Sequence, residues 1–267
     1  MADQITSFSN PLVKRVKRLR QKKYRQQEGL FFVEGLRLVL SALEAKAPIE
    51  TIIYCPELLT SDVAWERLRS LAEPGIRLQA VSAPVFASIS SRDNPVGLAA
   101  IVQTEWTALT DLTAGAGQIF VALFQVAEPG NLGTIIRTMD AVGAQGLILV
   151  GDSVDPYHPS AVKASMGALF SIAVSRTPDS QALLGWAESQ GLLTVASSAR
   201  GATPYDQVDY QLPALLLLGN EGTGLPAPVM AASKFTVAIP MAGAASSLNL
   251  AVAAGLLLYE IRQTAAD

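Results

Sequence analysis

The residues best suited to chemistry lie in a glycine-rich loop, residues 219–224, which follows the apolar run 215–218. Three glycines in six residues allow a backbone to approach a ligand closely or to adopt a positive φ. The apolar run is typical of a strand that is buried on both faces of a sheet. Glu221 places a carboxylate among these glycines, which is an unusual choice for a turn alone.

A second short strand, 235–239, ends at Pro240 and leads into another glycine-bearing loop. A helix is expected to start at Ser246 or Ser247, and it is apolar on nearly every side, which is typical of burial in a core or against a partner. Two strands that end in small-residue loops predict a ligand site at the carboxyl edge of a parallel sheet. Two tight turns at the sheet edge are the simpler alternative.

Arginine and asparagine side chains accompany a third strand end. The pattern predicts a strand over 119–124, a loop, and a helix over 134–142 that carries Arg137 one turn in. An arginine there could reach the same edge of the sheet, although a surface position is more usual. No Gly-x-Gly-x-x-Gly follows the strand, so the sequence does not indicate a dinucleotide fold.

These elements belong to a chain in which strands and helices alternate, which predicts an α/β protein. A segment poor in large apolar residues, 107–117, is the expected linker. It would separate a small α/β domain over 1–106 from a second domain over 118–267.

Three segments together resemble the signature motifs of the SpoU (TrmH) family of RNA 2′-O-ribose methyltransferases, in the SPOUT superfamily: NLGTIIRT, GNEGTGLP and IPMAGAASSLNLAVAAGLLLYE. The segment PSAVKASMGALF is also similar to the family pattern. The N-terminal part resembles the accessory substrate-binding domain of many members, so the resemblance spans nearly the whole chain. One departure is Glu128, where the family more often has Asp before Pro-Gly-Asn.

The resemblance implies a parallel sheet with a deep trefoil knot, S-adenosylmethionine as cofactor, and a homodimer formed through the catalytic domain. The catalytic positions that it implies are Asn131, Arg137, Glu221, Ser247 and Asn249. The implied cofactor positions are Leu218, Gly219, Asn220, Gly224, Ile239, Met241 and Leu248.

Charge is unevenly distributed along the chain. The net charge is −3, but eight basic residues follow one another near the N-terminus with no acid between them. The remaining 12 basic and 23 acidic residues give the rest of the chain a balance of −11. Such clustering is typical of a polyanion contact, although a solvated helical face is the ordinary explanation. The expected RNA-binding residues are Lys14, Arg15, Lys17, Arg18, Arg20, Lys22, Lys23 and Arg25.

Other classes of protein find little support. Cys55 is the only cysteine and His158 the only histidine, so no disulfide framework and no metal site is expected. The first ten residues lack the apolar core of a secretory signal, and no apolar run approaches the roughly 20 residues of a spanning helix. A cytoplasmic protein is expected.

The function that the resemblance implies is S-adenosylmethionine-dependent 2′-O-methylation of a structured RNA, ribosomal RNA in preference to transfer RNA. Arg137 is expected to act as a fixed positive donor rather than a base, because a guanidinium has a pKa above roughly 12. An RNA-binding assembly factor that has lost catalysis is the alternative from another class. A nucleotide-dependent oxidoreductase is disfavoured because the phosphate-binding fingerprint is missing.

Overall fold

The computed structural model describes residues 4–71, 75–201 and 203–264. The chain divides into two compact units. Unit 1 comprises Met1–Thr104 and Tyr157–Phe170, and unit 2 comprises Glu105–Pro156 and Ser171–Asp267. Residues 107–117, the expected linker, therefore group with unit 2, and residues 157–170, expected in the second domain, group with unit 1.

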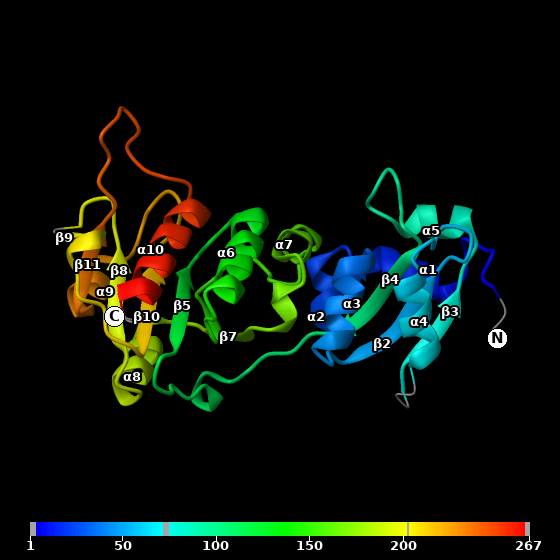
Figure 1. Cartoon of the computed structure of the whole chain (residues 1–267), viewed down its shortest axis with the longest axis horizontal. Helices are drawn as coiled ribbons and strands as arrows, with labels where there is room; N and C mark the ends of the chain where they lie inside the picture. The colour runs from blue at the N-terminus through cyan, green and yellow to red at the C-terminus, as the bar shows by residue number, and fades with distance from the viewer. Residues whose placement is uncertain (1–3, 72–74, 202, 265–267) are drawn as a thin grey trace. The chain divides into compact units, whose positions relative to one another are not determined.

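Unit 1 is built on a four-stranded sheet with the order β1-β4-β2-β3 (Figure 1). Strand β4 pairs antiparallel with β1 and β2, whereas β2 and β3 are parallel. The strands are β1 (Leu30–Glu34), β2 (Ile49–Tyr54), β3 (Arg77–Ala80) and β4 (Leu98–Gln103), and the helices before residue 104 are α1 (Pro11–Arg18), α2 (Lys22–Glu28), α3 (Leu36–Glu44), α4 (Asp62–Ser70) and α5 (Ala83–Ile89).

The core of unit 1 joins the first helix to one face of this sheet. Val13 and Val16 of α1 pack with Phe86 of α5 and with Ile53 and Ile101 of the sheet. Cys55 is buried in the same cluster, and burial together with a hydrogen bond to Glu57 raises the pKa of its thiol to about 11. The basic segment near the N-terminus forms two helices rather than one, because the chain turns after α1 and starts α2 at Lys22.

The segment 157–170 packs on unit 1 through aromatic side chains. It contains α7 (Pro159–Ser165) and the 3-10 helix η2 (Ala168–Phe170). The Phe31 ring lies 4.7 Å from the Tyr157 ring and 6.3 Å from the Phe170 ring, between centroids. Met166 and Gly167, both with positive φ, separate α7 from η2.

Unit 2 is built on a seven-stranded parallel sheet with the order β7-β6-β5-β10-β8-β11-β9. The central strands β5, β6 and β10 are buried along their whole length, which explains their uninterrupted apolar runs. The strands are β5 (Ile119–Phe124), β6 (Gly146–Val150), β7 (Ala173–Thr177), β8 (Leu193–Ser197), β9 (Thr203–Pro204), β10 (Ala214–Leu218) and β11 (Phe235–Ala238).

Helices follow most of these strands. They are η1 (Leu109–Asp111), α6 (Pro129–Ala141), α8 (Ser180–Ser189), η3 (Tyr205–Gln207), α9 (Ala227–Ala232) and α10 (Leu250–Thr264), of which α8 and α9 were not expected. The last helix, α10, packs against α6 and against β10. The expected α/β class with a parallel sheet is confirmed.

The strand order decides which loops meet. β10 lies between β5 and β8, and Leu218 is in register with Leu123 at the carboxyl end of β5. The loops that leave β5 and β10 are therefore neighbours, whereas β8 separates β10 from β11. This edge of the sheet carries the candidate site.

No helix within the described ranges is long and apolar enough to cross a membrane.

Candidate functional site

Three segments that are far apart in the sequence are joined by a chain of hydrogen bonds. Asn249 Nδ2 donates to Asn131 Oδ1 over 3.0 Å, and Asn131 Nδ2 donates to Glu221 Oε1 over 3.2 Å. The second carboxylate oxygen of Glu221 accepts from the backbone N–H of Ala127 at 3.4 Å. Asn131, Glu221 and Asn249, each predicted from a different motif, therefore form one polar cluster.

The position of Asn131 follows from where α6 begins. The helix starts at Pro129, five residues before the expected start at 134, because proline at the first helical position has the φ that a helix needs and lacks the N–H that a helix start leaves unpaired. Asn131 consequently lies on the first turn of α6, next to the loop that follows β5. Arg137 lies on the third turn, not one turn in as expected.

Asn249 both joins the cluster and caps α10. Its Oδ1 accepts from the backbone N–H of Ala251 at 2.9 Å and from that of Val252 at 3.4 Å. The helix therefore begins at Leu250 rather than at the expected Ser246 or Ser247, because the asparagine side chain supplies the cap.

The loop 219–224 is held in shape by Asn220. Its Oδ1 accepts from the backbone N–H groups of Gly222, at 2.8 Å, and Thr223, at 3.1 Å. Its Nδ2 donates to the backbone oxygen of Gln125 over 2.7 Å. Gln125 has a φ of 50°, in the left-handed region that few residues other than glycine adopt. Sequence analysis missed Gln125, since glutamine gives no signal for a positive φ.

Gly219 is required by close packing within the same loop. A Cβ at this position would lie 2.2 Å from the carbonyl carbon of Gly224 and 2.3 Å from the backbone nitrogen of Leu225. The backbone also pairs across the loop, from Asn220 N to Gly224 O at 3.2 Å and from Gly224 N to Asn220 O at 2.9 Å. The loop is thus tight, and most of its surface is exposed.

Apolar side chains are left uncovered next to this edge of the sheet. Met241 and Leu248 are 37% and 36% exposed, whereas Leu218 is 1% exposed. Ile239 is partly buried. Leu248 directly precedes Asn249 of the cluster, so at least one exposed apolar side chain lies in the segment that joins it. Exposed apolar side chains together with a carboxylate suit a ligand with an apolar ring and a positive charge.

Two predicted catalytic residues do not join the cluster. Arg137 follows Asn131 by six residues, which places it about 9 Å further along the helix axis. Its side chain is exposed, and no hydrogen bond or ion pair links it to another described residue. Ser247 is exposed and likewise has no such partner among the described residues.

Asn249 allows its two roles to be separated by substitution. Asn249→Asp keeps an oxygen that caps α10 but removes the N–H that reaches Asn131, so we expect unchanged thermal stability and reduced methyl transfer. Asn249→Ala should lose both, with a cost of about 1 kcal/mol in the free energy of unfolding. Thermal denaturation and a methyl-incorporation assay measure the two effects. Full transfer by the aspartate variant would show that the bond to Asn131 is dispensable.

The basic residues of unit 1 fall into two groups. Arg25 is 2% exposed, and its Nη1 donates to the backbone oxygens of Leu19 and Arg20. Arg20 Nη2 donates to the backbone oxygens of Ile89 and Ser90. The expectation that Arg25 binds RNA is wrong, because its guanidinium is buried and stabilises the turn between α1 and α2.

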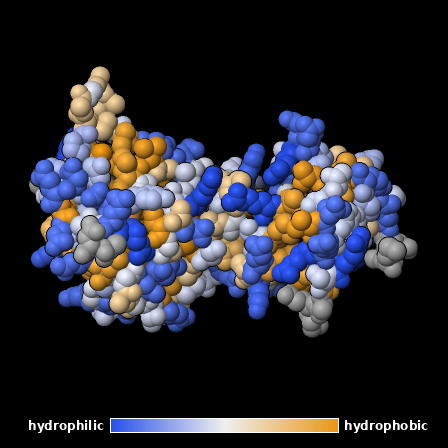
Figure 2. All heavy atoms as spheres, viewed as in Figure 1, coloured by the Kyte–Doolittle hydropathy of each residue, from blue (hydrophilic) through white to orange (hydrophobic). Residues whose placement is uncertain are grey.

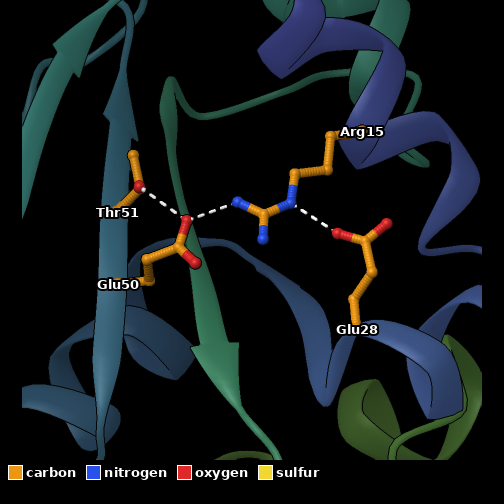
Figure 3. Close-up of polar contacts among 4 residues, drawn as sticks. All are labelled: Arg15, Glu28, Glu50 and Thr51. Carbon is orange, nitrogen blue, oxygen red and sulfur yellow. Dashed lines mark hydrogen bonds and ion pairs between the residues drawn. The ribbon is translucent and has the colours of Figure 1, made fainter.

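Arg15 is held by two acids that the sequence places far from it (Figure 3). Its Nε lies 2.5 Å from Glu28 Oε2, and its Nη1 lies 2.6 Å from Glu50 Oε1. These carboxylates raise the pKa of Arg15 against the opposing effect of desolvation, which is the larger single contribution. The charge of Arg15 is therefore neutralised within the unit, and Arg15 is a poor candidate for phosphate binding.

The other predicted basic residues remain on the surface. Lys14, Lys17, Arg18, Lys22 and Lys23 are exposed. The cations of Arg18 and Lys23 lie 5.6 Å and 5.9 Å from the centroid of the Tyr24 ring. An aromatic ring flanked by cations suits nucleic acid, which offers both phosphates and stacking bases.

A metal centre has no support in the part of the chain that the structure describes, where no group of three or more His, Cys, Asp or Glu side chains could hold an ion. His158 instead caps α7, accepting from the backbone N–H of Ser160 at 3.2 Å.

Each of the two parts of the chain matches a known protein family. Residues 118–259 match the SpoU rRNA Methylase family, and residues 10–100 match the MRM3-like substrate binding domain. The first match contains the whole cluster of Asn131, Glu221 and Asn249.

Individual relatives cover nearly the whole chain. The 23S rRNA (uridine(2479)-2′-O)-methyltransferase of Streptomyces viridochromogenes is 34% identical over 90% of this chain and 85% of its own length. The 23S rRNA (guanosine(2553)-2′-O)-methyltransferase RlmP of Bacillus subtilis is 30% identical over 97% and 99%. The crystal structure of an AdoMet-bound rRNA methyltransferase from Sinorhizobium meliloti is 39% identical, with a TM-score of 0.88 over 98% of this chain and 97% of that one.

Proposed function

Because this chain belongs to the SpoU rRNA methylase family, we propose that it transfers a methyl group from S-adenosylmethionine to a ribose 2′-hydroxyl of a structured RNA. The observation that carries this proposal is the polar cluster of Asn131, Glu221 and Asn249 beside the glycine loop 219–224. Its members come from all three motifs, and strand order and helix capping bring them together.

The site fits S-adenosylmethionine on its own chemistry. Two kinds of group would hold it: backbone groups of the tight loop, and apolar side chains that are partly uncovered. The residues concerned are Leu218, Gly219, Asn220, Gly224, Ile239, Met241 and Leu248. A carboxylate such as Glu221 favours a positively charged sulfonium nearby. The cofactor, when bound, supplies a methyl group that is already activated by the sulfonium.

The protein must then position the ribose oxygen and stabilise the charge that develops on it. Positioning alone is worth up to about 7–11 kcal/mol in ideal cases. Asn131 and Asn249 have amide groups that orient a partner by hydrogen bonds. A guanidinium is a poor base, so we assign Arg137 the role of a fixed donor to the developing alkoxide or an adjacent phosphate.

Ribosomal RNA is the substrate that we propose over transfer RNA. Support comes from two relatives that are named as 23S rRNA 2′-O-methyltransferases and that align with this chain from the N-terminal domain through the motifs. The exposed cations on α1 and α2 would neutralise phosphates, so binding should weaken steeply with salt.

The proposal is tested by methyl incorporation into RNA. Purified protein and labelled S-adenosylmethionine are added to ribosomal RNA and transfer RNA from cells that lack the gene, and 2′-O-methyl marks are mapped by resistance to alkaline hydrolysis. We expect one new mark in ribosomal RNA. A mark confined to transfer RNA would replace the proposed substrate, and no incorporation together with no cofactor binding by calorimetry would favour a silent assembly factor.

We further infer that the protein is a homodimer through unit 2. Val252, Leu256 and Tyr259 of α10 are 52%, 40% and 50% exposed and recur at helical spacing, so they form one apolar stripe. A second copy that covers this stripe by a two-fold contact would bury it on both chains. The neighbouring helix α6, which carries Arg137, packs against α10 and would lie close to the same interface.

The dimer is tested by Leu256→Glu, which puts a charge in the middle of the stripe. We expect a protein of dimer mass to become monomeric in light scattering, because desolvating an unpaired carboxylate in an apolar interface costs several kcal/mol. Gln181→Glu, which introduces the same charge at an exposed position of α8, is the matched control. A wild-type protein that is already monomeric at micromolar concentration contradicts the inference.

The knot and the cellular compartment are also part of this proposal. The knot is proposed from the match of residues 118–259 to the SpoU rRNA Methylase family, whose members the resemblance above describes as knotted. A substrate in the ribosome and a single reduced thiol at Cys55 support a cytoplasmic location.

A further inference from the structure

The loop between α5 and β4, residues 90–96, has a polar tip that is exposed to solvent. Figure 1 shows it, in teal, projecting from the end of α5, and Figure 2 shows hydrophilic atoms over it. Ser91, Arg92, Asp93 and Asn94 are all exposed. Asp93 and Asn94 make no side-chain hydrogen bond or ion pair with any described residue. Such a loop would ordinarily be a passive connection.

The base of this loop is nevertheless fixed by a buried carboxylate. Glu34, at the end of β1, is 8% exposed, and it accepts hydrogen bonds from Ser90 Oγ, from Ser91 N at 2.8 Å and from Ser91 Oγ at 3.1 Å. Burying a carboxylate is costly unless hydrogen bonds satisfy it. All of these donors belong to the loop, so Glu34 holds residues 90–91 in place.

Hydrogen bonds hold one end of the loop, and close packing at a glycine holds the other. Arg20 Nη2 donates to the backbone oxygens of Ile89, at 3.0 Å, and Ser90, at 2.9 Å, which ties the loop to the turn between the basic helices. At the other end, Gly97 has a φ of 72°, and a Cβ there would lie 2.7 Å from Leu59 N. Both ends of the loop are thus anchored to unit 1.

Arg92 is positioned by the backbone of Glu34 and Gly35. Its guanidinium lies over Gly35, where an added Cβ would be 2.7 Å from Nη2, and Nη2 contacts Glu34 O at 3.5 Å. Gly35 has a φ of 112°, so the chain uses a glycine where a side chain would displace the arginine. The remaining N–H groups of Arg92 have no partner among the described residues.

We propose that the loop 90–96 reads the edges of unpaired bases in the RNA substrate, an inference that rests on the RNA methyltransferase function proposed above. Arg92 and Asp93 cancel in charge, so the loop adds little to the attraction of phosphates, and Asp93 opposes it. A guanidinium, a carboxylate and an amide are instead the groups that recognise the donor and acceptor pattern of base edges. In RNA, such edges are accessible mainly in single-stranded loops and bulges. The exposed cations on α1 and α2 supply affinity, and this loop supplies selectivity.

The experiment compares Arg92→Ala with wild-type protein on two probes, a 23S ribosomal RNA transcript and polyuridylate, over a range of salt concentrations. We expect Arg92→Ala to lower affinity for the transcript about tenfold or more. Its affinity for polyuridylate and the salt slope should stay unchanged. Arg69→Ala, an exposed arginine on α4, is the matched control and should match wild type on both probes.

Other outcomes overturn the proposal. Equal losses on both probes, with a salt slope smaller by about one, would make Arg92 a phosphate contact. Unchanged binding by Arg92→Ala, while the wild type still prefers the transcript, would overturn the loop's role and leave the methyltransferase function intact. A wild-type protein that does not prefer the transcript over polyuridylate would overturn the proposal for the loop, whereas the proposed function fails only if no methyl group is incorporated into RNA. Glu34→Gln, which loosens the base of the loop, should lose selectivity with Arg92 still present.

Discussion

Arg137→Ala is expected to bind S-adenosylmethionine like wild type and to lose at least about 100-fold in methyl transfer, the usual scale for removing one donor that stabilises an oxyanion. The guanidinium lies on the exposed side of α6 and has no structural partner among the described residues, so its removal should not unfold the protein. Calorimetry measures the binding of S-adenosylmethionine, and incorporation of a labelled methyl group into RNA measures methyl transfer. Asp140→Asn, one turn further along α6, is the control for a charge change on this helix.

Normal turnover by Arg137→Ala would remove Arg137 from the mechanism. If transfer is lost as expected, mixed dimers show which chain supplies the arginine. Arg137 lies about 9 Å along the helix from Asn131, so in the proposed homodimer it could serve the site of either chain. When Arg137→Ala and Glu221→Ala chains are mixed at random, about a quarter of wild-type activity should return if the arginine acts across the interface. No activity should return if it acts within its own chain.

Gly219→Ala is expected to weaken S-adenosylmethionine binding more than any other single methyl group added to the loop 219–224. The new Cβ would lie 2.2–2.5 Å from three backbone atoms of Gly224 and Leu225, and backbone cannot give way as a flexible side chain can. We expect affinity to fall at least tenfold and the free energy of unfolding to drop by about 1–3 kcal/mol, as in other overpacked sites. Calorimetry and denaturation measure these two changes.

The same loop provides its own controls. A Cβ at Gly222 would meet only Asn220 Oδ1, at 3.5 Å, which is an ordinary contact, so Gly222→Ala should bind the cofactor like wild type. Gly224 has open space but a φ of 71°, so Gly224→Ala should be intermediate, through backbone strain alone. If all three variants bind equally well, the tight loop is not the cofactor site.

Much of the fold was predictable because local patterns report burial. The uninterrupted apolar runs of β5 and β10 indicated strands of a parallel sheet, and the structure places both in its centre. Helix starts were less predictable, since Pro129 reads equally well as a turn residue and as the first residue of a helix. The helices α8 and α9 were not predicted, because their apolar residues do not recur clearly at helical spacing.

By itself the sequence determined the motifs, the family, and the three side chains that form the polar cluster. Only the tertiary structure decided that Asn249 meets Asn131 across 118 positions of sequence, and that Asn131 meets Glu221 across 90. The tertiary structure also decided which cations are buried or ion-paired inside unit 1. In the sequence, Arg25 and Arg15 look no different from Lys14 or Lys17. The physical reason is that residue type and short-range spacing fix burial and helix or strand preference, whereas strand order and long-range pairing decide which side chains become neighbours.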